Sequence, residues 1–165
     1  MRRFAFVVLV LLLFSSVLFA QKVGIYAGYS YVRMDTTPAL NSNGFEIQPM
    51  FKLSKHFAVM GDFTGTYASA MGVTFHQYTY MGGPAYVAKV GKSAQFNFHY
   101  LVGGANFGCC GDTLNSFAMA PGIGLDFKVA NKVWIRPVEF DYVYARYIGR
   151  TNNDFRYGAG VLFMF

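Results

Sequence analysis

The feature that most constrains the fold is a two-residue alternation of apolar with small or polar side chains, which recurs from Val23 to the C-terminus. It is clearest in the last stretch, Asp154–Phe165. There, aromatic and aliphatic residues occupy one face, while Arg156 and Gly160 lie on the other. A period of two is that of a β-strand whose two faces meet different surroundings. The chain therefore predicts an all-β fold.

Eight segments alternate in this way, and each has an apolar face. They are 23–33, 44–53, 57–67, 76–87, 95–106, 117–129, 133–145 and 154–165. Aromatic residues make up 19% of the chain and charged residues only 13%. The chain therefore has too few other residues to shield so many apolar faces from water, and we expect these faces to contact lipid. A sheet in lipid must close into a barrel, because a free edge leaves backbone groups unpaired. We expect an antiparallel, up-and-down transmembrane β-barrel of about eight strands, whose last strand pairs with its first.

The connections are expected to alternate between short turns and longer loops. The longer ones are 34–43, 68–75, 107–115 and 146–153. Short periplasmic turns and long external loops are typical of outer-membrane barrels, so both termini should lie on the periplasmic side. A soluble lipocalin-like barrel is the alternative. It would reverse the faces and crowd phenylalanine and tyrosine from every strand into a lumen too narrow for them.

The first 20 residues have the organisation of a secretory signal. Arg2 and Arg3 precede the apolar run Phe4–Leu13, and Ala20 is a suitable cleavage residue. A single transmembrane anchor is the alternative, although the run is short for a full span. We expect a cleaved signal peptide at 1–20, a barrel domain at 21–165, and an outer-membrane location after cleavage.

The polar face predicts the content of the barrel interior, which in an eight-stranded barrel is just wide enough for its own side chains. Its charged members are Glu46, Lys52, Asp62, Asp126, Lys128, Glu139, Asp141 and Arg156. We expect them to form an ion-pair network that plugs the lumen. Arg136 is left open, because it either faces outward near a turn or is turned inward by a β-bulge.

The basic residues sort by type along the predicted barrel. The lysines fall near the periplasmic end, and four arginines fall near the external loops: Arg33, Arg146, Arg150 and Arg156. Guanidinium groups bind phosphate through two parallel hydrogen bonds, so these arginines are candidate contacts to lipopolysaccharide. Ordinary solvated charge at the rim is the alternative. The net charge of +6 could indicate nucleic acid, but export argues against that partner.

No catalytic or cofactor-binding pattern stands out. Of the three histidines only His99 falls at the depth of the interior carboxylates, and no serine lies on its strand. The adjacent Cys109 and Cys110 cannot link distant strands and lack the further ligands that a metal site needs. We expect a non-enzymatic protein without cofactor or metal, which has a structural, envelope-integrity or surface-interaction role. The first alternative is a small pore, and the second is a lipid-modifying enzyme.

Five segments resemble the eight-stranded outer-membrane β-barrel family of Gram-negative bacteria, of the OmpA, OmpX and opacity-porin type. They are YMGGPAYV (80–87), LVGGANFG (101–108), GIGLDFKV (122–129), RPVEFDYVYARY (136–147) and NNDFRYGAGVLFMF (152–165). The resemblance implies a barrel in lipid, and we expect it to be a monomer. It also implies a C-terminal signal for the outer-membrane assembly machinery, carried by Gly160, Phe163 and Phe165. The polar position of that signal falls on Gly158, which departs from the pattern.

Overall fold

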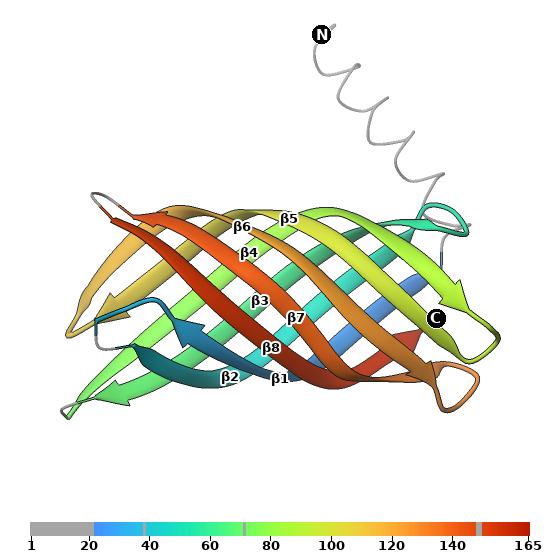
Figure 1. Cartoon of the computed structure of the whole chain (residues 1–165), viewed down its shortest axis with the longest axis horizontal. Helices are drawn as coiled ribbons and strands as arrows, with labels where there is room; N and C mark the ends of the chain where they lie inside the picture. Colours follow the sequence, from blue (N-terminus) through green and yellow to red (C-terminus); the bar gives the residue numbers. More distant parts are fainter. Residues whose placement is uncertain (1–21, 38, 71, 148–149) are drawn as a thin grey trace, which may run out of the picture.

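The computed structural model describes residues 22–37, 39–70, 72–147 and 150–165, except for the side chains of Tyr147 and Arg150. Within them, eight strands form one closed antiparallel barrel, in which β1 pairs with both β2 and β8 (Figure 1). The strands are β1 (Val23–Met34), β2 (Leu40–Lys52), β3 (Phe57–Ala70), β4 (Val73–Val90), β5 (Ala94–Cys109), β6 (Asp112–Lys128), β7 (Val133–Tyr147) and β8 (Arg150–Met164). The predicted fold and its closure are confirmed.

The signal peptide expected at 1–20, with its cleavage site, lies outside the described residues. Among the residues that are described, no helix combines the length and the apolar character needed to cross a membrane.

The two ends of the barrel differ in their connections. One end, here called the terminal end, carries Lys22, Phe165 and the connections 53–56, 91–93 and 129–132 (Figure 1). The opposite, distal end is where β1 is followed by β2, β3 by β4, β5 by β6 and β7 by β8. The expectation of loops across 34–43, 68–75, 107–115 and 146–153 is wrong, because strands extend into each of these ranges. Side-chain alternation and hydrogen-bonded strand pairing both continue there.

The cysteine segment illustrates this difference. Instead of lying in a loop from 107 to 115, Cys109 ends β5 and pairs with Asp112 at the start of β6. Cys110 and Gly111 form the turn with φ values of 57° and 91°. A two-residue hairpin with positive φ at both positions matches the right-handed twist of its strands, which permits the tight connection. Both cysteines are free thiols.

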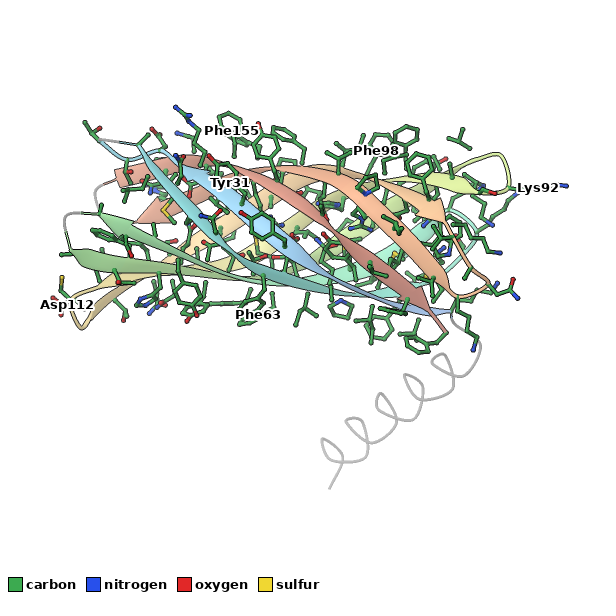
Figure 2. The ribbon with its side chains drawn as sticks, turned by 90° about the horizontal axis from the view of Figure 1, so that it is seen from below. Tyr31, Phe63, Lys92, Phe98, Asp112 and Phe155 are labelled. Carbon is green, nitrogen blue, oxygen red and sulfur yellow. The ribbon has the colours of Figure 1, made fainter. Side chains whose placement is uncertain are left out.

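The outer face of the barrel is apolar around the whole circumference. Figure 2 shows Phe63, Phe98 and Phe155 projecting from different parts of the ribbon. The exposed apolar set also includes Ile25, Phe45, Ile47, Tyr80, Tyr100, Val102, Phe127, Val138, Tyr157 and Phe163. A continuous belt of this kind is unfavourable in water and is the surface that a barrel presents to hydrocarbon.

The inner face holds two kinds of contact. A hydrophobic cluster that includes Met50, Met60, Val87 and Leu162 is buried, with Trp134 and Met164 packed against it. Buried polar and charged side chains fill the adjoining volume. Trp134 faces inward with this cluster, for a reason that lies in the following residues of β7.

Candidate functional site

Arg156 organises the first half of a charged cluster inside the barrel. It occupies an inward position of β8, with its side chain 1% exposed. Its Nε lies 2.8 Å from Asp141 Oδ2, and its Nη1 lies 3.0 Å from Asp62 Oδ1. Nη2 lies 3.3 Å from Glu46 Oε1, and Nη1 also donates to Thr64 Oγ1 at 2.6 Å. One guanidinium thereby joins β2, β3, β7 and β8 across the lumen.

Arg136 organises the second half. Its Nε lies 2.6 Å from Asp126 Oδ1, and its Nη1 lies 2.9 Å from Glu139 Oε2. Nη1 also donates to Gln48 Oε1 at 2.7 Å. The guanidinium carbon stands 4.4 Å from the ring centroid of Tyr26, a cation–π arrangement. Arg136 is 1% exposed, so of the two orientations left open by the sequence, the structure has the inward one.

A bulge in β7 causes this orientation. The pairing of β7 with β8 shifts between Arg136 and Glu139, and Pro137 lies in the irregular stretch. Proline lacks an N–H group to donate to the ladder, so a bulge is a favourable place for it. The extra residue reverses the alternation, so that Trp134 and Arg136 face inward before the bulge and Glu139 faces inward after it.

Gln48 and His99 connect the two arginine centres. Gln48 Nε2 donates to Glu46 Oε1 at 2.6 Å and to Glu139 Oε1 at 2.8 Å. His99 Nε2 lies 2.6 Å from Asp141 Oδ1, and His99 Nδ1 lies 3.1 Å from Asn97 Oδ1. The result is a single hydrogen-bonded network through the middle of the barrel.

Glycines leave the space that this network fills. A Cβ atom at Gly122 would lie 1.7 Å from Asp141 Oδ1 and 2.3 Å from His99 Nε2. At Gly124 it would lie 2.4 Å from Asn97 Nδ2. The polar contacts between the neighbouring strands β5 and β7 can form only because these two positions of β6 have no side chain.

The chemistry of the cluster is that of an acid-rich ion-pair network. Five carboxylates (Glu46, Asp62, Asp126, Glu139 and Asp141) surround two guanidinium groups. His99, Glu139 and Asp141 offer ligand atoms within 4.8 Å of one another, so they could hold a metal ion. However, Asp141 is already engaged by Arg156 and Glu139 by Arg136. An enzymatic role would need His99 as a base, but this histidine bonds to the carboxylate of Asp141 and the amide of Asn97. The buried hydroxyl of Ser42 does not bond to it, and donates to Val32 O and Thr66 Oγ1.

Two lysines expected in this network lie elsewhere. Lys128 is exposed and Lys52 half-buried, and among the described residues neither forms an ion pair with a carboxylate. They stand at the ends of β6 and β2, at the mouth of the terminal end. The alternation correctly placed them on the inner face, but it does not show how far along the barrel axis the dry interior extends.

The arginines expected at the external rim separate into two groups. Arg156 is buried and paired in the lumen, so its expected role as a lipopolysaccharide contact is wrong. Arg33 and Arg146 are exposed near the distal end. The side chain of Arg150 lies outside the described residues.

The three positions of the expected assembly signal lie on β8 and directly after it. Phe163 is 44% exposed and Phe165 65% exposed, both on the outer face. Gly160 faces inward beside β1, where a Cβ atom would lie 2.3 Å from the carbonyl oxygen of Ala27. A larger residue there would interfere with the strand pair that closes the barrel.

Sequence reasoning missed Gln48 and Thr64 as members of the network and left Arg136 undecided. The Arg136–Pro137 pair inside an alternating strand is the signal that could have located the bulge. Nothing local to Gln48 distinguishes it from other inward polar residues, because its role depends on side chains from three other strands.

No family model and no curated protein sequence matches the chain. Among solved structures, it is similar to the attachment invasion locus protein Ail of Yersinia pestis, with 19% identity over 87% of this chain and 99% of that one and a TM-score of 0.55. It is also similar to neisserial surface protein A, with 14% identity over 87% and 97% and a TM-score of 0.70. OprG of Pseudomonas aeruginosa gives 11% identity over 88% and 96%, with a TM-score of 0.64. The chain therefore has the closed eight-stranded fold of outer-membrane barrels.

Proposed function

We propose that this chain is an integral outer-membrane barrel with a structural, envelope-integrity or surface-interaction role, and that its lumen is closed to ions. The observation that carries the proposal is the network of Arg136 and Arg156, which links carboxylates from β2, β3, β6 and β7 across the interior. Side chains held from opposite sides of an eight-stranded barrel leave little room for a water-filled path.

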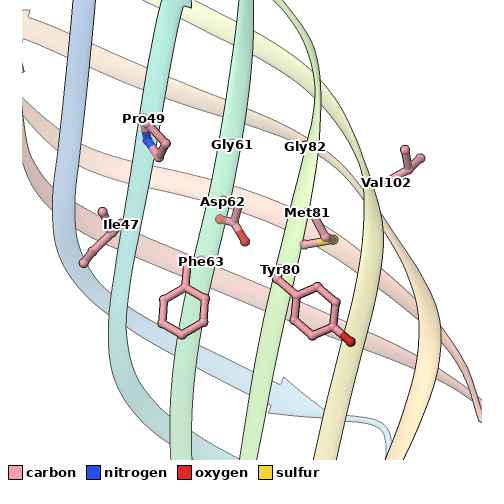
Figure 3. Close-up of a pocket in the computed structure, with 9 residues that line it drawn as sticks. All are labelled: Ile47, Pro49, Gly61, Asp62, Phe63, Tyr80, Met81, Gly82 and Val102. Carbon is pink, nitrogen blue, oxygen red and sulfur yellow. The ribbon is translucent and has the colours of Figure 1, made fainter. Parts of the chain in front are cut away.

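The outer face supports a location in lipid. A hollow of about 500 Å³ on this face is lined by Gly61 and Gly82 and, on one side, by Phe63 and Tyr80 (Figure 3). Asp62 and Met81, on the same two strands, are buried on the other side of the sheet. An acyl chain fits such an apolar depression, whereas water would gain no hydrogen bonds there.

Conductance in planar bilayers tests the closed lumen. We expect no stable single-channel steps from the purified wild-type barrel, because the ion-pair network occupies the interior. Replacing both network arginines, Arg136→Ala with Arg156→Ala, should produce steps if the doubly substituted barrel remains folded by circular dichroism. Reproducible steps from the wild type would favour the alternative function, a small pore for ions or solutes.

Cell fractionation tests the location. The protein should be recovered in the outer-membrane fraction and should require detergent for extraction. The exposed aromatic residues Phe163 and Phe165 suit recognition of the last strand by the assembly machinery. Removing both rings should therefore reduce the amount of folded barrel in that fraction. Recovery of soluble protein from the periplasm without detergent would contradict the proposal.

Lipopolysaccharide remains a proposed partner through Arg33 and Arg146. Exchanging both for lysine keeps the charge and removes the two-point hydrogen bonding of guanidinium. Lipopolysaccharide should then raise the melting temperature of the wild type more than that of the Arg33→Lys, Arg146→Lys variant. Equal increases would show that these residues are only solvated charge.

A further inference from the structure

All seven lysines of the chain gather at the terminal end. They stand before β1 (Lys22), at the ends of β2, β4 and β6 (Lys52, Lys89 and Lys128), and in the three connections of that end (Lys55, Lys92 and Lys132). Figure 2 shows Lys92 at one extremity of the barrel and Asp112 at the other. Lysines scattered only for solubility would be expected at both ends, but the distal end has none.

Five of these lysines line one cavity. A space of about 410 Å³ is bounded by Lys22, Lys52, Lys89, Lys92 and Lys128, and here it is called the lysine basin. Lys52, Lys89 and Lys128 continue the inward-facing series of their strands, so the basin opens at the end of the lumen. The basin is therefore a concave site, unlike a scatter of surface charges.

Backbone hydrogen bonds fix the positions from which these side chains extend. Lys52 N donates to Lys22 O at 3.0 Å, and Lys128 N donates to Ser93 O at 2.8 Å. The second bond brings the end of β6 against the connection that carries Lys92. Lysines from four parts of the chain are thus held around the same space.

Carboxylates do little to neutralise the basin. Asp126 attracts Lys52 electrostatically, but it is already paired with Arg136. Six of the eight acidic residues are buried inside the barrel, and the other two, Asp35 and Asp112, are exposed at the distal end. No ion pair joins a lysine to a carboxylate among the described residues. Several uncompensated ammonium groups around one cavity repel each other, and an anion placed among them relieves that repulsion.

The basin also has an apolar wall. Trp134 and Met164 line it and pack against the hydrophobic cluster of the interior. Trp134 is the single tryptophan of the chain, so its fluorescence reports on this site alone.

We propose that the lysine basin binds a phosphate-bearing anion. Ammonium groups bind phosphate as point charges, and several of them arranged around a pocket suit the multiple negative charges of a phosphate compound. Two sources share this chemistry, a soluble phosphate compound and the headgroup of an anionic phospholipid. The proposal requires neither a closed lumen nor a contact to lipopolysaccharide at the distal end.

Titration with tripolyphosphate tests the proposal. The full barrel, in zwitterionic detergent micelles and at constant ionic strength, should show a saturable change in Trp134 fluorescence. Removing three basin charges, with Lys52→Gln, Lys89→Gln and Lys128→Gln, should raise the midpoint by roughly tenfold, equal to about 1.4 kcal/mol. A linear response, or none, in the wild type would overturn the proposal.

A matched variant separates a site from general attraction. Lys55→Gln with Lys132→Gln removes two positive charges of the same end that do not line the basin, and should leave the midpoint within about twofold. A weakening per removed charge as large as that of the basin variant would overturn the proposal. If the basin variant fails to fold, Lys→Arg exchange at the same three positions keeps the charge. That variant should bind within a few-fold of the wild type, and a loss of saturable binding by the folded protein would overturn the proposal.

Nanodiscs distinguish the two sources. In phosphatidylcholine discs the fluorescence should match that in micelles and should respond to tripolyphosphate. If a lipid headgroup occupies the basin, adding phosphatidylglycerol should produce the bound-state emission without tripolyphosphate. Unchanged emission, followed by a normal titration, would assign the basin to soluble phosphate compounds.

Discussion

The two populations of basic residues in this barrel, the buried arginines and the lysines of the basin, differ in almost every contact. Arg136 and Arg156 are each 1% exposed and each pairs with at least two carboxylates. The lysines stand at a water-accessible mouth and form no ion pair with a carboxylate among the described residues. Guanidinium is weakly hydrated and has five donors in a plane, so it can satisfy several carboxylates in a dry interior. Ammonium is compact and strongly hydrated, and it remains where water can reach it.

The largest expected effect comes from removing a buried arginine. Arg156→Ala leaves Asp62 and Asp141 in the interior without their cation. The free energy of unfolding should therefore fall by about 3–5 kcal/mol. Urea unfolding of the barrel in lipid vesicles measures this loss. Arg146→Ala, at an exposed position, is the control and should stay within about 0.5 kcal/mol of the wild type. Similar losses from the two substitutions would remove the distinction between buried and exposed basic residues.

A smaller loss is expected from changing the space around the network without changing its charge. Gly122→Ala would place a methyl group against the contact of His99 with Asp141. Crowding of this kind should lower the free energy of unfolding by about 1–3 kcal/mol. Gly82→Ala is the matched control, because a Cβ atom there would meet only Met60 O at 3.5 Å, an ordinary contact. If the two alanine variants unfold at the same urea concentration, the packing of the network is looser than the distances indicate.

The smallest effect is expected in the basin. Lys89→Gln removes one unpaired charge, so the free energy of unfolding should change by less than about 0.5 kcal/mol. At low salt the change should be a gain, because repulsion from neighbouring lysines is relieved, and the gain should disappear at high salt through screening. Unfolding at both salt concentrations measures this. A salt-independent loss would indicate that Lys89 has a stabilising partner after all.

The expected ion-pair network shows which features of the interior could be predicted from the sequence. Alternation correctly placed Glu46, Asp62 and Asp141 on the inner face, since the period of a strand is a local property. The same reasoning put Lys128 in the network, and it placed Arg156 both in the network, which is correct, and at the rim, which is wrong. The two errors concern the position along the barrel axis, which depends on strand tilt and register around the closed sheet.

The sequence by itself determined that this chain forms a closed barrel with an apolar outer face, because the alternation recurs in eight segments and a sheet in lipid cannot leave an edge unpaired. It also placed the lysines near one end of the barrel. Only the tertiary structure decided that Arg136 faces inward and that Gln48 bridges the two arginine centres. It alone assembled the lysine basin from four parts of the chain. The physical reason is that bulges, register and cross-lumen contacts are set by side chains far apart in sequence, and no local pattern records them.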